Sequence, residues 1–232
     1  MNAVAIILGI VIIILFFVLY KYFTTTAYKL STKTNISLNT DQAALAITKI
    51  DSATSNQYAY GIWVYINTWK GTSIKTIFTH DSVLKVYIDE NKPILNVDVT
   101  LSNDSVSKNM VVDNFPLQKW VFIIVSMDTS FLDVYLDGKL LKSFKINDAK
   151  QPPSNPRITL GNQSGTIGKP YQPFDAVVTL FYRWSVPMDP GTAWNYYMKG
   201  NGQGGLLSSM STYGVNMQVL QNNIETSTYK LL

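Results

Sequence analysis

The sequence predicts an all-β fold of antiparallel strands, preceded by a single apolar helix. Three observations lead to this prediction. The segment Leu117–Ile146 alternates, turns and alternates again, as a meander of strands does. Short alternating segments recur along the chain at the spacing expected of a sandwich or a barrel. An uninterrupted apolar run at the N-terminus has the length of a membrane span.

The apolar run from Ala3 to Tyr20 contains no charged residue. As a helix it would be about 27 Å long at roughly 1.5 Å per residue, close to the thickness of a bilayer core. A signal peptide would have a basic stretch before the run, and none is present. A buried core helix is the alternative, but such a helix normally has a polar face. We predict a transmembrane anchor over residues 1–23, which includes Ala3, Ile10, Leu15, Tyr20 and Lys21.

The charges that flank the run predict its orientation. Lys21, Lys29 and Lys33 follow the run before the first acid, Asp41. By the positive-inside rule the globular part then lies on the cytosolic side of a single-pass membrane protein. Glycosylated Asn-x-Ser sequons would favour the opposite orientation, but in a chain rich in Asn, Ser and Thr a few arise by chance. The three sequons begin at Asn35, Asn103 and Asn162.

Residues 24–55 are polar, and we predict a membrane-proximal spacer with an edge strand at Asn35–Asn39. The next four predicted strands are Tyr58–Ile66, Lys75–Thr79, Val83–Ile88 and Ile94–Leu101, and a loop is expected over Ser102–Lys108. The first of these strands has two apolar faces. It is therefore expected to be a central strand that is covered on both sides or that borders a concave groove.

The meander has three predicted strands, which are Trp120–Val125, Phe131–Leu136 and Leu140–Ile146. The last two are joined by Asp137-Gly138, a strong signal for a two-residue type I′ hairpin turn. Everything else in the chain is expected to pair with this meander or to tether it.

Three further features complete the predicted fold. Prolines break the chain over Gln151–Pro156, and a short strand follows at Arg157–Leu160. In the strand Ala176–Trp184, strict alternation would place Val178, Leu180 and Tyr182 on one face. A single helical turn is expected around Ala193–Met198, and residues 206–232 are expected to form a C-terminal hairpin that completes the sandwich.

Composition excludes several classes of function. The chain has no cysteine, which rules out disulfides and cysteine nucleophiles. Its net charge of +4 is small and its lysines are scattered, so no nucleic-acid surface is expected. An aromatic-rich, weakly charged β chain is typical of a packed sandwich whose surface is itself covered by partners.

Three segments resemble the laminin-G-like, concanavalin A-like lectin/glucanase family. They are the Tyr58–Ile66 strand, the run from Trp120 to Leu141 with its Asp-Gly-Lys turn, and Leu160-Gly161 together with Phe174–Trp184. This resemblance implies an antiparallel two-sheet jelly roll, which we assign to residues 56–205. The chain departs from the family pattern at Phe174-Asp175-Ala176, where a glycine is usual.

Glucanases of this family carry paired carboxylates in a Glu-x-Asp-x-x-Glu strand. This chain has only two glutamates, Glu90 and Glu225, in unrelated segments. The single histidine, His80, has no accompanying triad motif, and no phosphate-binding loop is present. We therefore expect no enzymatic activity and no cofactor.

Calcium-assisted sugar binding remains as an alternative, with Asp81, Asp89 and Asp104 as metal-ligand candidates spread over several turns. The aromatic residues Trp63, Tyr65 and Trp69 could stack on a sugar or contact a partner, although packing within the sheets is the favoured interpretation.

Two functions follow from the anchor and the resemblance. Membrane-anchored proteins of this kind are similar to minor structural proteins of large icosahedral DNA viruses with an inner membrane. That similarity implies a virion protein that links the lipid bilayer to capsid proteins, with its domain facing the shell. The alternative is a membrane-anchored, carbohydrate-binding adhesion module.

Overall fold

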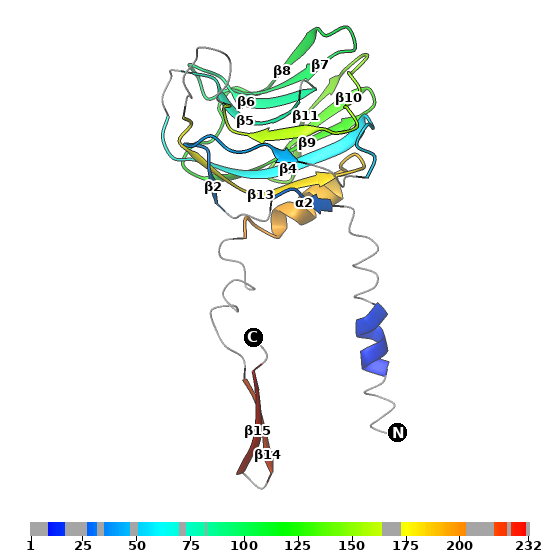
Figure 1. The fold of residues 1–232 in the computed structure, drawn as a ribbon, viewed down its shortest axis with the longest axis vertical. Helices are drawn as coiled ribbons and strands as arrows, with labels where there is room; N and C mark the ends of the chain where they lie inside the picture. Colours follow the sequence, from blue (N-terminus) through cyan, green and yellow to red (C-terminus); the bar gives the residue numbers. More distant parts are fainter. Residues whose placement is uncertain are drawn as a thin grey trace.

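Two antiparallel sheets stack face to face and enclose the hydrophobic core (Figure 1). The predicted all-β, two-sheet sandwich is thus confirmed, and its arrangement is consistent with a jelly roll. The computed structural model describes residues 9–16, 27–31, 35–46, 51–69, 73–81, 83–163, 173–202, 216–221 and 224–230.

The first sheet, sheet A, has seven strands, all paired antiparallel. In spatial order they are β1 (Ala27–Lys29), β13 (Ala176–Trp184), β4 (Gln57–Ile66), β9 (Trp120–Asp128), β10 (Phe131–Leu136) and β11 (Lys139–Lys145), with β2 (Ile36–Ser37) also paired to β13.

The second sheet, sheet B, has six strands and is likewise antiparallel. In spatial order they are β3 (Leu45–Ala46), β12 (Arg157–Leu160), β5 (Lys75–His80), β6 (Leu84–Ile88), β7 (Leu95–Thr100) and β8 (Val106–Val112).

Strand β4 lies in the middle of sheet A and is covered on both faces, as its two apolar faces predicted. One face, which includes Tyr60 and Ile62, packs in the core between the two sheets. The other face carries Trp63, which belongs to a second buried cluster on the outer side of sheet A. The short helix α2 (Pro190–Met198) lies against this side of sheet A (Figure 1), and its Ala193 belongs to the second cluster.

The meander is formed by β9, β10 and β11, as predicted. Its tight turn has positive φ at both central residues, 49° at Asp137 and 78° at Gly138. The Asp137 side chain also has a role that the turn alone does not require, because its Oδ1 accepts a hydrogen bond from the backbone N–H of Phe122 at 2.9 Å. The turn is thereby tied to the neighbouring strand β9.

Helix α2 is held against sheet A at its N-terminal end. The N-cap Asp189 accepts a hydrogen bond from the backbone N–H of Thr192 at 2.9 Å, which satisfies one of the free donors of the first turn. The residue before it is Met188. Its carbonyl accepts a hydrogen bond from the Tyr135 hydroxyl at 3.0 Å, and its backbone N–H donates one to Ser126 Oγ at 2.8 Å. A helical segment was predicted around Ala193–Met198, and the observed helix is three residues longer at its start.

Gly61, in the middle of β4, leaves room for a tryptophan ring on the outer face of sheet A. A Cβ at this position would lie 2.8 Å from two ring atoms of the buried Trp184 and 3.2 Å from Phe122. Because Trp184 is buried in the cluster under α2, its ring has no space to move away from the added methyl group. We expect Gly61→Ala to lower the free energy of unfolding by about 1–3 kcal/mol through overpacking, measured by urea denaturation. Unchanged stability would mean that this cluster repacks easily.

Strand β13 departs from the predicted alternation. Val178 and Phe181 both pack in the core between the sheets, although they are three residues apart. Leu180, with a φ of 50°, forms a bulge at which the pairing with β4 shifts register. The prediction that Val178, Leu180 and Tyr182 share one face is therefore wrong, because the extra residue of a bulge moves the following side chains to the opposite face.

Part of the predicted spacer belongs to the sandwich. Strands β1, β2 and β3 all lie within residues 24–55 and pair with β13 or β12. Leu38 is fully buried, and the Asn39 side chain donates a hydrogen bond to Asp175 Oδ1 at 3.0 Å. The expected edge strand at Asn35–Asn39 is present as β2.

The loop predicted over Ser102–Lys108 is shorter than expected, because Val106–Lys108 lie in β8.

The two ends of the chain differ in how far they match expectation. Residues 9–16 are helical, and among the residues that the structure describes no helix is long and apolar enough to cross a membrane. The predicted hairpin is present as β14 (Asn216–Gln221) and β15 (Ile224–Lys230), which form a two-stranded sheet of their own. Among the described strands it pairs with neither large sheet, and its part in completing the sandwich stays a prediction.

Candidate functional site

The outer face of sheet B carries a row of polar side chains, which runs from the buried Thr159 at one end to the exposed Lys108 at the other. In β6, Leu84, Val86 and Ile88 point into the core, so the residues between them face outward. The strand register places the outward side chains in line across the sheet. The polar face, as we name this row, consists of Thr159, Thr79, Lys85, Asp98 and Lys108, with Tyr87 beside it.

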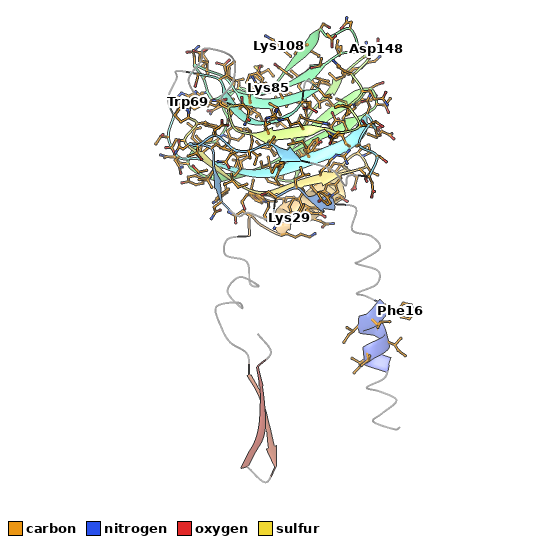
Figure 2. The ribbon with its side chains drawn as sticks, in the orientation of Figure 1. Phe16, Lys29, Trp69, Lys85, Lys108 and Asp148 are labelled. Atoms are coloured by element: carbon orange, nitrogen blue, oxygen red, sulfur yellow. The ribbon has the colours of Figure 1, made fainter. Side chains whose placement is uncertain are left out.

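The charges on the polar face alternate. Asp98 pairs in register with Lys85 on one side and Lys108 on the other. The hydroxyl of Tyr87 donates a hydrogen bond to Asp98 Oδ1 at 3.2 Å, and Lys85 Nζ lies 5.0 Å from the Tyr87 ring centre. Figure 2 shows Lys85 and Lys108 on the side of the sandwich away from α2.

Partial burial shifts the acid–base properties of this group. Desolvation raises the pKa of Asp98 above its usual value, against the lowering effect of the Tyr87 hydrogen bond and the two lysines. Desolvation likewise lowers the pKa of Lys85, and it raises the pKa of Tyr87 to about 12 together with the nearby Asp98 charge. Partly desolvated donors and acceptors in fixed positions favour recognition of a polar partner, because a hydrogen bond made where the local dielectric is low is electrostatically stronger than one made in water.

The three aromatic candidates for a ligand surface are not brought together. Trp63 is only 5% exposed and is stacked between Phe122 and Tyr197, with ring centres 5.0 and 5.7 Å away. Trp63 is therefore part of the packing under α2 and cannot contact a ligand. Tyr65 is half-buried against Trp120 on the same side of the sheet.

Trp69 lies in a different place. Its ring packs at the edge of the core between the sheets and has Lys75 Nζ 4.1 Å from its centre. Lys75 in turn donates hydrogen bonds to the carbonyls of Ser73 and Glu90. These contacts tie Trp69 and Ser73 to the start of β5, which is a structural role.

The acidic candidates for calcium ligation are each engaged separately. Asp81 Oδ2 accepts the backbone N–H of Arg157 at 2.7 Å, Asp89 Oδ1 accepts that of Asn91 at 3.0 Å, and Asp104 is paired with Lys150. Within the described ranges no three His, Cys, Asp or Glu side chains gather where they could hold a metal ion. The arrangement of these three acids gives no support to the predicted calcium site.

A buried polar cluster lies at one end of the core, and sequence reasoning did not predict it. His80 Nδ1 is 3.2 Å from the hydroxyl of Tyr60, and its ring lies 5.7 Å from that of Tyr58. Arg183 is buried beside them and donates hydrogen bonds to the carbonyls of Asp51 and Ser52. The one available signal was the arginine in a strand of mainly apolar residues.

These features define a class of protein: an antiparallel sandwich module in which one sheet is covered by a helix and the other presents a polar face. Residues 38–192 match the profile of the concanavalin A-like lectin/glucanases superfamily, of the laminin G type. The match covers more than half of the chain, and the chain therefore belongs to this superfamily.

Solved structures with the same fold include binding domains of botulinum neurotoxins. The binding domain of botulinum neurotoxin DC, in complex with rat synaptotagmin II, has 15% identity and a TM-score of 0.51, over 64% of this chain and 37% of that one. The same domain in complex with SialylT has 16% identity, the same TM-score and the same coverage. This chain thus spans little more than a third of their length, and the likeness concerns the fold. No curated protein sequence matches the chain.

Proposed function

We propose that the chain is a non-catalytic interaction protein, held in a membrane by residues 1–23 and presenting its sandwich on the cytosolic side. One observation carries this proposal. Seven consecutive apolar side chains, at positions 10–16, are each 46–69% exposed in the helix over residues 9–16. A helix that is apolar on every side is typical of a membrane span, because lipid removes the cost of exposing apolar surface to water. The sequence extends the same run over Ala3–Tyr20.

The absence of catalysis is supported by the placement of the acids. Glu90 follows β6, whereas Glu225 lies on β15 of the separate hairpin. The sequence lacks the Glu-x-Asp-x-x-Glu strand that supplies the paired carboxylates for glycoside hydrolysis in glucanases of this family. On the polar face, Asp98 has two lysines and a tyrosine as its neighbours, and no second carboxylate is paired with it in register. This arrangement favours the binding of a polar partner over catalysis.

The biological setting that we propose is a virion. A protein anchored in the inner membrane of a large icosahedral virus, with its domain on the former cytosolic side, would contact the capsid shell as a minor capsid or virion membrane protein. The family resemblance and the positive flank of the anchor support this setting. The polar face would then bind a neighbouring structural protein.

Mild detergent extraction from the native membrane or particle tests the partner. We expect the chain to migrate with a protein partner, and Lys108→Glu to weaken that association at least about tenfold, since it places a second acid beside Asp98. Lys145→Glu, which makes the same charge change on the exposed edge strand β11 of the other sheet, is the matched control. Migration as a free monomer, or equal effects of both variants, would contradict a partner on the polar face.

A carbohydrate ligand is the second candidate, favoured by the partly exposed Tyr87 ring beside the Asp98 carboxylate. Sugars combine an apolar ring face with hydroxyl groups, and this pairing of ring and carboxylate could serve both. On a glycan array we expect binding that Tyr87→Ala abolishes and Trp63→Phe preserves, because Trp63 is buried. No binding at high protein density would exclude this candidate.

A further inference from the structure

The chain enters the sandwich beside α2. Ala27, the first residue of β1, pairs with Trp184 and packs against the buried cluster on the outer side of sheet A. The same cluster contains Ala193 of α2, and Tyr196 of α2 lies edge-on to Trp184 with ring centres 4.8 Å apart. The point of entry and the helix therefore share one face of the domain.

The connection between the proposed anchor and this entry point is short. From Lys21 to Ala27 the chain advances six residues, a reach of about 20 Å when fully extended. A domain of about 155 residues, from 38 to 192, has a radius of gyration of about 15 Å. The diameter of such a domain is larger than the reach of the connection. The lipid headgroup layer takes up a further 5–8 Å or so of the distance. If the anchor spans the bilayer as proposed above, the face with Ala27 and α2 must lie close to the membrane.

The outer surface of α2 has the composition of a membrane-interface segment. Trp194 and Met198, one helical turn apart, are 42% and 63% exposed. Lys199 follows them, with its Nζ 3.9 Å from the centre of the Tyr196 ring. Tryptophan and tyrosine favour the headgroup region, and lysine can extend its charge toward lipid phosphates. Lys29, on the exposed part of β1, lies on the same side of the domain (Figure 2).

We propose that this outer surface of α2, formed by Trp194, Met198 and Lys199, rests on the headgroups of the bilayer that holds the anchor. Because α2 lies on the side of sheet A away from sheet B (Figure 1), sheet A then lies between the membrane and sheet B. The polar face with Lys85 and Asp98 is turned away from the membrane, where a partner can reach it. This inference depends on the proposed anchor and adds the orientation of the domain to it.

Spin labelling of the full chain can test this orientation, because the sequence has no native cysteine. Met198→Cys is compared with Met110→Cys, a methionine that is 48% exposed on β8 of the opposite sheet. Leu15→Cys reports on the anchor. Each labelled chain is placed in nanodiscs of phosphatidylcholine with a minor fraction of phosphatidylserine. Collisions of the label with oxygen, which concentrates in lipid, and with a soluble nickel chelate, which stays in water, are then measured.

We expect the nickel collision rate at position 198 to be several-fold lower than at position 110, with oxygen collisions at least as frequent. Equal rates at 198 and 110, with position 15 shielded from nickel and rich in oxygen, would overturn the orientation and leave the anchor intact. Shielding of position 198 from both reagents would indicate contact with another protein and would also overturn it. If position 15 itself collides freely with the nickel chelate, the anchor fails and the orientation fails with it.

Discussion

Acidification from pH 7.5 to pH 4.5 is expected to lower the free energy of unfolding by about 2.5 kcal/mol through His80 alone. Burial lowers the pKa of His80 from 6.5 to about 4, and the positive charge of Arg183 acts in the same direction. His80 is the only histidine of the chain, so no other imidazole titrates in this range.

The surroundings of His80 explain why its neutral form is favoured. Tyr58 and Tyr60 on β4 face it with un-ionised hydroxyls, because burial raises the pKa of both tyrosines. Arg183 on β13 brings a positive charge. In the folded state the imidazole therefore stays neutral at a pH where the unfolded chain already binds a proton. The stabilisation is complete above about pH 6.5 and is lost progressively as the pH falls toward about 4.

Urea denaturation at a series of pH values measures this effect. His80→Asn keeps a hydrogen-bonding side chain near Tyr60 but cannot titrate, so the difference between the two proteins isolates the imidazole from the carboxyl groups. We expect stability to fall by up to about 1.4 kcal/mol per pH unit in the wild type and to vary much less in the variant between pH 6.5 and 5. Equal slopes would show that water reaches the imidazole.

The parts of the fold that the sequence predicted are those in which local signals agree with tertiary packing. In the meander, the alternation of β10 and the Asp137-Gly138 turn independently require the same hairpin. In β4, every position from Tyr58 to Ile66 carries a residue suited to burial, which favours a central strand covered on both faces. The superfamily match over residues 38–192 agrees with both.

Other features depend on contacts that a linear pattern does not contain. The bulge at Leu180 inserts one residue into a strand whose side chains are apolar on both faces, so either register looks equally good in the sequence. Strand β8 carries Ser107, Lys108 and Asn109, so part of it has the polar sequence of a loop, and its strand conformation depends on pairing with β7. That β8 is an edge strand follows from the strand order of sheet B, in which β7 is its one neighbour, and a linear pattern does not contain that order.

The candidate site shows the same limit more strongly. The alternation of Val83–Ile88 was recognised, but the polar face requires five strands to be aligned, and Thr159 is more than sixty residues from Asp98. Trp63 was a candidate contact residue because aromatic residues favour both sugar faces and sheet packing. Its burial depends on α2, which the chain forms about 130 residues later.

Gly138→Ala is expected to lower the free energy of unfolding by about 3 kcal/mol, from two separate causes. The first is local, because Gly138 has a φ of 78° and a side chain in this left-handed region is strained. The second is tertiary. A Cβ at Gly138 would lie 2.9 Å from Tyr197 Cβ and 3.1 Å from Trp194 Cα, so α2 would have to move away from the hairpin.

Gly200 separates the two causes. It has a similar φ of 74°, but a Cβ there would meet nothing within 4 Å. Gly200→Ala therefore carries the backbone strain alone, and we expect a loss of about 1 kcal/mol in the same urea denaturation measurement. The excess loss in Gly138→Ala measures how firmly α2 is held against sheet A. If both variants lose the same amount, α2 is loosely attached, and the surface formed by Trp194 and Met198 then has no fixed position from which to contact a membrane.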